Sequence, residues 1–287
     1  MIEHPVFPGL RFRDDDELGA LLGSAVAERR VVHEWPLTRT EEVRLSDGRH
    51  VAYKCQLPPS IEPGFYASAR SPLLPAHVDL GRDGECSYLV TDWIESESLH
   101  AQRLSRDDLL SAASDVVDAI SRIDGDPPTY LDLSTRKSWD EANDDVVSKL
   151  RTLIGMGRFG AIPLADVDRL RRWAGEPGVI AAATARPTVV HGDLSLEEVF
   201  RVHDGWRVID WQRPVLGPRE LDLVSLLRHA RIDPAPFVAR EFVELSSFLL
   251  LHWSVTASHD LLPDLPPELP QSWAVTSIRE ILALQGE

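Results

Sequence analysis

Hydrophobic and polar residues alternate along much of the first third of the chain, whereas later apolar residues recur at helical spacing. Two segments, 41–57 and 198–211, alternate on both sides of an Asp-Gly pair, which is the strongest short-range signal of a β-hairpin. The Asp-Gly pairs stand at 47–48 and 204–205. If each pair forms a two-residue turn, the numbers of facing residues sum to 95 in the first hairpin and to 409 in the second.

Helical spacing of apolar residues predicts a helix over 15–30, before the first hairpin, and several more from Ser105 onward. Between them the apolar segment 85–94 predicts another strand. The later helices are expected at 105–123, 138–153, 164–183, from 217 onward, at 236–262 and at 273–284. The change from strand to helix patterns predicts an α+β fold with a small antiparallel sheet at 1–94 and a mainly helical part at 95–287.

The first hairpin places a lysine among apolar residues. With the expected pairing, Val43 faces Ala52 and Glu41 faces Lys54, so that Val43, Ala52 and Lys54 share one face of the sheet. A buried ammonium group needs an anionic partner, because an unpaired charge is costly to remove from water. The alternative is a lysine at a sheet edge whose amino group reaches solvent.

The second hairpin gathers acidic residues. Its expected register brings Glu198 and Asp210 to the open end of the hairpin, beside the loop that carries Asp193. Three carboxylates in one small volume repel one another unless a cation lies between them, and oxygen ligands suit Mg²⁺. The alternative is an ordinary hairpin with carboxylates on its surface.

Composition narrows the classes of function. The 287 residues are 43% hydrophobic and 26% charged, which is typical of a globular protein with a substantial core. The net charge of −16 argues against a partner that is a nucleic acid or an anionic membrane. A solvated acidic surface accounts for this charge, which also suits a cationic small substrate. The two cysteines lack the spacing of a metal site, and the sequence shows neither an apolar leader nor an apolar run long enough to span a membrane. These features predict a cytoplasmic protein.

Three motifs together resemble one enzyme family. His191-Gly192-Asp193 is followed, 17 residues after Asp193, by Asp210 in the sequence Ile-Asp-Trp, and Val51-Ala52-Tyr53-Lys54 lies upstream. This combination resembles the aminoglycoside phosphotransferase and choline kinase-like family over residues of about 30–230. The resemblance implies a protein-kinase-like fold of two lobes, in which the N-terminal lobe binds a nucleotide.

The resemblance assigns roles around the nucleotide. Lys54 would contact the α- and β-phosphates and pair with Glu62, while Val43 and Ala52 would cover the base. Asp92, Trp93 and Ile94 would form the hinge between the lobes.

It also assigns roles around the transferred phosphate. Asp193 would act on the acceptor hydroxyl, and Asp210 with Glu198 would hold Mg²⁺. His191 and Asp222 would support the loop that carries Asp193; an ordinary acid at the start of a helix is the alternative for Asp222.

Two departures from the family pattern stand in this chain. Glu198 occupies the position where the family has asparagine, and the segment 35–41 contains no glycine. Glutamate can bind Mg²⁺ but adds negative charge beside a triphosphate, and a loop without glycine approaches phosphates less closely. A catalytically impaired pseudokinase that binds or regulates is therefore one alternative to an active enzyme, and an unrelated α+β protein in which the three motifs coincide by chance is the other.

The expected activity is transfer of the γ-phosphate of ATP or GTP to a hydroxyl of a small molecule, such as an aminoglycoside-like antibiotic or a related metabolite. The sequence does not choose between ATP and GTP. It also leaves open the identity of the acceptor and the oligomeric state.

Overall fold

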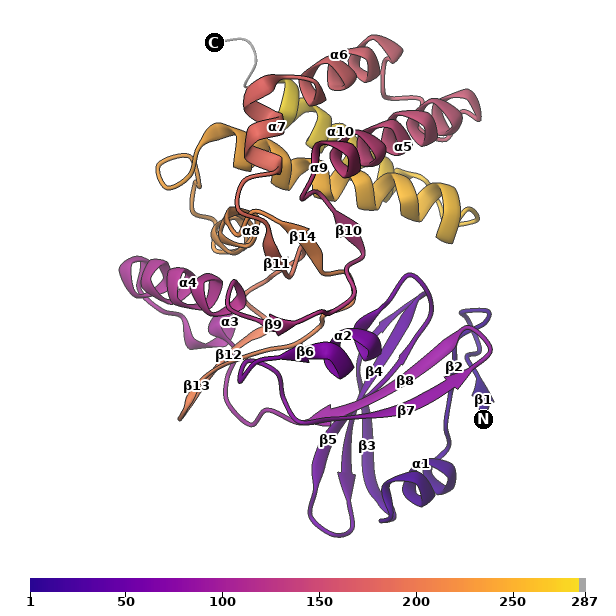
Figure 1. Cartoon of the computed structure of the whole chain (residues 1–287). Coiled ribbons are helices and arrows are strands. Elements are labelled where there is room, and N and C mark those ends of the chain that lie inside the picture. Colours follow the sequence, from indigo (N-terminus) through magenta and orange to yellow (C-terminus); the bar gives the residue numbers. More distant parts are fainter. Residues whose placement is uncertain (284–287) are drawn as a thin grey trace. The chain divides into compact units, whose positions relative to one another are not determined.

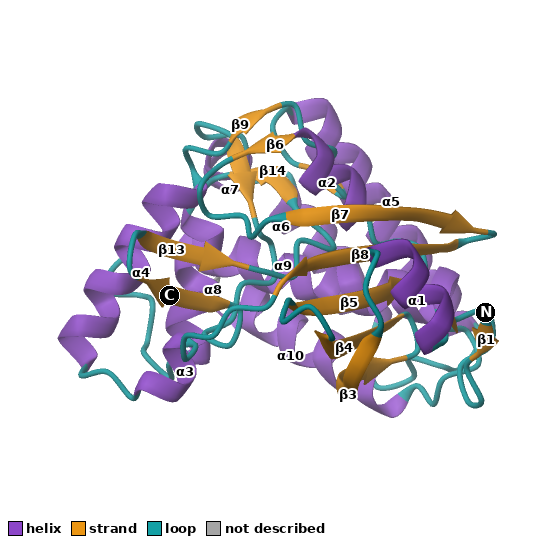
Figure 2. Cartoon of the chain, turned by 90° about the horizontal axis from the view of Figure 1, so that it is seen from below, coloured by secondary structure: helices purple, strands orange, loops and turns teal. Residues whose placement is uncertain are grey.

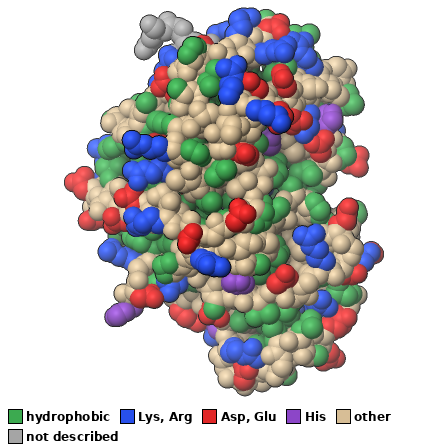
Figure 3. Space-filling view, viewed as in Figure 1, with side chains coloured by type: hydrophobic (Ala, Val, Ile, Leu, Met, Phe, Trp, Pro, Cys, Tyr) green, Lys and Arg blue, Asp and Glu red, His purple; other side chains and the backbone are tan. Residues whose placement is uncertain are grey.

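The computed structural model describes residues 1–283 of the chain, which divide into two compact units. The N-terminal unit comprises Met1–Arg103, Ile123–Pro128 and Glu197–Arg213. The C-terminal unit comprises Leu104–Arg122, Thr129–Leu196 and the chain from Pro214 onward. Among residues 1–283, none of the helices combines the length and apolar character needed to cross a bilayer. On the face drawn in Figure 3, acidic and basic side chains lie interspersed among hydrophobic ones.

A five-stranded antiparallel sheet forms the body of the N-terminal unit (Figure 1). Its strands, in spatial order, are β3 (Val26–Trp35), β4 (Thr38–Leu45), β5 (His50–Gln56), β8 (Cys86–Asp92) and β7 (His77–Asp83). The helices of this unit are α1 (Asp15–Leu22), α2 (Glu62–Ser68) and α3 (Leu99–Gln102). Shorter pairs join β1 (Ile2–Glu3) to β2 (Arg11–Phe12), β6 (Ala69–Arg70) to β9 (Asp124–Gly125), and β12 (Val199–Val202) to β13 (Gly205–Val208).

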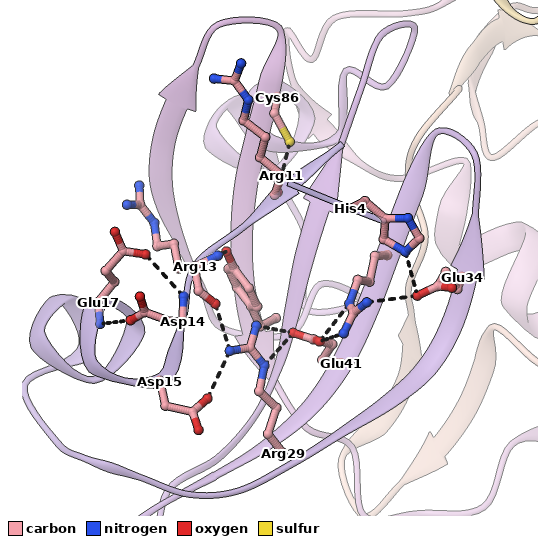
Figure 4. Close-up of polar contacts among 12 residues, drawn as sticks. His4, Arg11, Arg13, Asp14, Asp15, Glu17, Arg29, Glu34, Glu41 and Cys86 are labelled. Carbon is pink, nitrogen blue, oxygen red and sulfur yellow. Dashed lines mark hydrogen bonds and ion pairs between the residues drawn. The ribbon is translucent and has the colours of Figure 1, made fainter. Parts of the chain in front are cut away.

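The outer face of the sheet is covered by the N-terminal segment 1–14, which is held by a network of charges (Figure 4). Glu41 is 1% exposed and accepts hydrogen bonds from Arg29 Nε at 2.7 Å and from Arg39 Nε at 2.8 Å. Glu34 contacts both Arg39 and the imidazole Nε2 of His4, each at 3.0 Å. Because a buried carboxylate needs such partners, Glu41 fixes the two arginines and the segment packed on them.

Helices make up most of the C-terminal unit (Figure 2). They are α4 (Arg106–Ile120), α5 (Arg136–Gly155), α6 (Leu164–Ala174), α7 (Pro177–Ala183), α8 (Glu220–His229), α9 (Arg240–Thr256) with a π-turn at Ala257–Leu261, and α10 (Glu268–Ala283). A small sheet contains β10 (Leu131–Asp132), β14 (Val215–Gly217) and β11 (Thr188–Val190) in that order. The core of this unit centres on Trp139, Trp173 and Phe248, with the rings of Trp139 and Phe248 4.9 Å apart.

Several predicted elements end elsewhere than expected. The helix over 15–30 is wrong beyond Leu22, because Gly23 ends it in a left-handed conformation with φ of 72° and β3 follows. The predicted helix 164–183 is two helices, because the chain leaves α6 at Gly175 and Pro177 begins α7. The strand expected at 85–94 forms as β8, and Ser105 caps α4 as its sequence predicts. The last helix begins five residues before Trp273, and its predicted end, Leu284, lies outside the described residues.

Both predicted hairpins exist, but both registers are wrong. In the first, Val43 faces Val51 and the sum is 94, because Gly48 with φ of 89° makes a three-residue loop closed by Leu45 and Arg49. In the second, Val199 faces Val208 and the sum is 407, because the turn lies at 203–204 and Gly205, with φ of 135°, begins the strand.

Candidate active site

A pocket of about 320 Å³ lies in the N-terminal unit, between the inner face of the sheet, α2 and the β12–β13 hairpin. Ala52, Lys54 and Glu62 line it together with Glu198 and Asp210. The pocket is therefore built from segments 150 or so residues apart in sequence, which the fold of this one unit brings together.

Lys54 is the centre of the charges in this pocket. Its Nζ donates to Glu62 Oε2 at 2.7 Å and also forms an ion pair with Asp210 Oδ1. The pairing of Lys54 with Glu62 that the family resemblance implies is present in the structure. It forms although Pro63 and Gly64 follow Glu62, because proline is tolerated in the first turn of a helix, where its missing N–H has no partner to lose.

Burial and pairing act in opposite directions on these charges. Burial lowers the pKa of Lys54, but Asp210 and Glu62 outweigh it and hold that pKa above its ordinary value. Glu62 is 1% exposed, and burial raises its pKa above the ordinary range although Lys54 partly offsets the effect. Lys54 therefore remains an ammonium group, and the buried carboxylate of Glu62 depends on it.

Asp210 is held in an uncommon backbone conformation. Its φ is 73°, in the left-handed region that residues other than glycine rarely adopt, and Gln212 Nε2 donates to its Oδ1 at 2.8 Å. Such strain persists only where the surroundings enforce it, and it is frequent at functional sites. Here it accompanies a carboxylate that lines the pocket and contacts Lys54.

The acidic side chains of the pocket meet some of the requirements of a site for a hard cation. Glu198 and Asp210 both line it, and the backbone N–H of Ile209 donates to the carbonyl of Glu198 at 3.1 Å, which keeps the two residues at the open end of the hairpin. Within residues 1–283, no group of three or more His, Cys, Asp or Glu side chains is placed to hold a metal ion. Two carboxylates still fit Mg²⁺, which proteins commonly hold by one or two carboxylates together with phosphates and water.

The register error changes which residues of the first hairpin face the pocket. A slip of one residue moves side chains to the opposite face, so Ala52 and Lys54 share their face with Glu42 and Thr40. Val43 lies on the other face, fully buried among Tyr53 and the rest of the outer core. The expectation that Val43 covers the base together with Ala52 is therefore wrong.

The predicted hinge residues, Asp92, Trp93 and Ile94, line the pocket where β8 ends. The N–H of Trp93 donates to the carbonyl of His50 at 3.0 Å, and the two rings stack with their centroids 5.0 Å apart. These contacts fix the backbone after β8. The role of 92–94 as a hinge stays a prediction.

Other lining residues were not among the expected ones. Tyr66 lies four residues after Glu62 on α2, so the two share a helix face, a spacing that could have indicated it. Thr91 faces Ala52 across β5 and β8. Glu197 and Phe200 line the pocket on either side of Glu198.

In the C-terminal unit, the loop that carries Asp193 follows β11. The backbone N–H groups of His191 and Gly192 donate to the two carboxylate oxygens of Asp222, at 2.8 and 3.0 Å. Asp222 lies in the first turn of α8 and is 1% exposed, and burial raises its pKa. Because Gly192 has φ of 83°, the chain turns sharply between buried His191 and exposed Asp193. Asp222 thus supports the loop, as predicted.

Comparison with known proteins identifies the family of this chain. The model of the phosphotransferase enzyme family matches residues 66–257, more than half of the chain. The chain belongs to this family. It is therefore a phosphotransferase, and its fold is the protein-kinase-like one that the motifs indicate. A search of curated proteins found no match.

Solved structures share this fold at low sequence identity. A thermostable mutant of aminoglycoside phosphotransferase APH(4)-Ia, determined with ADP and hygromycin B, has a TM-score of 0.60 at 16% identity, covering 93% of this chain and 98% of its own. A choline/ethanolamine kinase family protein from Mesorhizobium loti has a TM-score of 0.63 at 14% identity, covering 91% of this chain and 89% of its own. Spectinomycin phosphotransferase APH(9)-Ia, determined with ADP and spectinomycin, has a TM-score of 0.56 at 10% identity, covering 96% of this chain and 99% of its own.

Proposed function

We propose that this phosphotransferase moves the γ-phosphate of ATP or GTP to a hydroxyl group of a small-molecule acceptor. The observation that supports it best is the pocket of the N-terminal unit, where Lys54, paired with Glu62, stands among the carboxylates of Asp210 and Glu198. A fixed ammonium group beside metal-binding oxygens is the arrangement that phosphoryl transfer requires. Ala52 and the segment 92–94 would hold the base.

In this proposal Lys54 contacts the phosphates of the donor, and Asp210 and Glu198 are the residues that would hold Mg²⁺. Bound there, Mg²⁺ would neutralise charge on the phosphate oxygens. Glu198 in place of asparagine keeps an oxygen ligand and adds one negative charge. The family match does not support the alternative of an impaired pseudokinase.

Asp193 would orient the acceptor hydroxyl and take its proton as the new O–P bond forms and the bond to the leaving nucleoside diphosphate breaks. Its loop is fixed by the two hydrogen bonds to Asp222, so the carboxylate is positioned without being buried. Catalysis would come mainly from positioning and charge neutralisation.

We propose a cationic acceptor, such as an aminoglycoside, because the chain carries a net charge of −16. The solved structures of related fold include enzymes crystallised with hygromycin B and spectinomycin. A screen of nucleotide consumption with ATP and GTP against aminoglycosides, amino alcohols, neutral sugars and nucleosides tests this. Turnover of neutral sugars or nucleosides alone would exclude the cationic class.

The role of Asp193 is tested on whichever acceptor reacts. Asp193→Asn is expected to lower kcat by roughly 10²–10⁴, the usual share of a general base, while nucleotide affinity stays unchanged. Asp204→Asn, in the exposed turn of the β12–β13 hairpin, is the matched control and should keep full activity. Full activity in Asp193→Asn would exclude the proposed role.

A further inference from the structure

The pocket is short of positive charge. Its lining side chains that the structure describes include five carboxylates, at 62, 92, 197, 198 and 210, but only one ammonium or guanidinium group, that of Lys54. Lys54 is already paired with Glu62 and Asp210. A nucleoside triphosphate carries several negative charges, so further donors have to contact its phosphates.

The β3–β4 hairpin has no glycine-rich backbone loop that would supply those donors. The β3–β4 hairpin turns at Pro36-Leu37, between the facing residues Trp35 and Thr38. Proline has no N–H, and strands β3 and β4 contain no glycine that would allow a concave row of free N–H groups. The N–H groups of β4 are directed to its neighbours β3 and β5, and those of β3, an edge strand, lie in the plane of the sheet and do not point to its inner face. Phosphate contacts on the inner face of this hairpin are therefore expected from its side chains.

One row of side chains lies in the right place. His33 faces Thr40 across β3 and β4, and Thr40 faces Lys54 across β4 and β5. Facing residues point to the same side of a sheet, and all three line the pocket. Neighbouring strands are about 4.8 Å apart, so His33 and Lys54 lie on either side of Thr40 with their backbones roughly 10 Å from each other. Their side chains are long enough to contact the same anion across this distance.

A β-bulge places His33 in this row. The register of β3 against β4 shifts between Val31 and His33, so that Val32 is an extra residue opposite Thr40. Without the bulge, Val32 would face Thr40 and the imidazole would point to the outer face. Bulges of this kind re-aim side chains beside functional sites. Both Val32 and His33 consequently line the pocket.

Two donors of this row, the imidazole of His33 and the hydroxyl of Thr40, are uncommitted. Among the hydrogen bonds and ion pairs of residues 1–283, none engages the His33 imidazole or the Thr40 hydroxyl. An imidazole offers an N–H in both its neutral and its charged form, and a threonine hydroxyl donates equally to a phosphate oxygen. These groups point into a pocket whose ammonium group lies in the same row.

We propose that His33 and Thr40 contact the phosphates of the bound nucleotide beside Lys54, in place of a glycine-rich backbone loop. The proposal rests on the proposed function, since it assumes a nucleoside di- or triphosphate in this pocket. It assigns to the side chains of β3 and β4 a share, beside Lys54, in the discrimination between phosphorylated and unphosphorylated nucleosides.

The test is calorimetric titration of adenosine, ADP and a non-hydrolysable ATP analogue, with their guanosine counterparts, in the presence of Mg²⁺. His33→Ala and Thr40→Val are each expected to weaken binding of the di- and triphosphates about tenfold, the loss of one hydrogen bond to a charged group, and to leave nucleoside binding unchanged. His33→Gln, which keeps a side-chain N–H, should recover part of the loss. His203→Ala, in the exposed β12–β13 turn, is the control and should bind like the unaltered protein.

The outcomes separate the two proposals. If the unaltered protein binds the di- and triphosphates and neither His33→Ala nor Thr40→Val weakens them, the phosphate contacts are refuted and the proposed function stands. An equal loss for nucleosides and nucleotides would show that these residues shape the pocket instead, and would also refute the contacts. If the unaltered protein binds no nucleotide, both proposals fall. Thermal unfolding of each variant shows whether it is folded.

Discussion

Removing Lys54 should make the stability of the protein depend more steeply on pH. In Lys54→Met the carboxyl group of Glu62, 1% exposed, loses its buried cation, whereas Asp210 keeps access to water with 37% of its side chain exposed. Breaking a buried ion pair by removing one partner costs about 3–5 kcal/mol. For a chain of this size each kcal/mol lowers the melting temperature by about 2–4 °C, so a loss of about 10 °C is expected at pH 8.

The loss should shrink as the pH falls. Burial already holds the pKa of Glu62 above its ordinary value, and without Lys54 that pKa rises further. A carboxyl whose pKa is raised in the folded state binds its proton more tightly there than in the unfolded chain. Stability is therefore retained at low pH and lost as the pH rises from the unfolded pKa towards the folded one, by at most about 1.4 kcal/mol per pH unit.

The assay is calorimetric or fluorescence-monitored thermal unfolding of the unaltered protein and the variants from pH 5 to 9. Lys54→Met/Glu62→Gln removes the uncompensated charge and should recover most of the loss at pH 8. Lys137→Met is the matched control, because Lys137 is 86% exposed and its pair with Glu141 at 3.6 Å contributes little. The reasoning is refuted if Lys54→Met is as stable as the unaltered protein at pH 8, or if adding Glu62→Gln restores nothing.

Two further substitutions test other parts of the structure. Asp222→Asn keeps one acceptor oxygen but turns an NH₂ group towards one of the N–H groups of His191 and Gly192. It should therefore lower the stability by about 1–3 kcal/mol and reduce kcat on any accepted substrate. An unchanged melting temperature would contradict the role of Asp222 in supporting the loop. Glu41→Gln removes the buried carboxylate that Arg29 and Arg39 share. It should lower the free energy of unfolding by about 3 kcal/mol without altering nucleotide affinity. A melting temperature within about 1 °C of that of the unaltered protein would contradict the role of this network.

The motifs indicated more of the site than the strand patterns did. Lys54 and Glu62 were identified by their resemblance to a family, and their ion pair forms despite a helix start, Pro63-Gly64, that local propensity disfavours. Asp222 was placed in the same way, since neither its burial nor its two N–H partners can be derived from a helix-start pattern. Such long-range partners come from tertiary structure.

Register was the weakest part of the prediction. An Asp-Gly pair indicates a hairpin but leaves open whether the loop has two or three residues, and that choice decided the side of the sheet on which Val43 lies. The first half of β3, residues 26–30, was taken for helix because Val26 follows Leu18 and Leu22 at helical spacing, and the exposed residues of this strand show no alternation. The bulge at Val32, which points His33 into the pocket, has no signature in the sequence.

The central claim is that the pocket around Lys54 and Asp210 binds a nucleoside triphosphate together with Mg²⁺. Titration calorimetry of ATP and GTP into the unaltered protein and into Asp210→Ala, each with and without Mg²⁺, tests it without knowledge of the acceptor. We expect one or both nucleotides to bind, with an affinity that Mg²⁺ strengthens in the unaltered protein and no longer strengthens in Asp210→Ala. Absence of binding, or binding that depends on neither Mg²⁺ nor Asp210, would contradict the account.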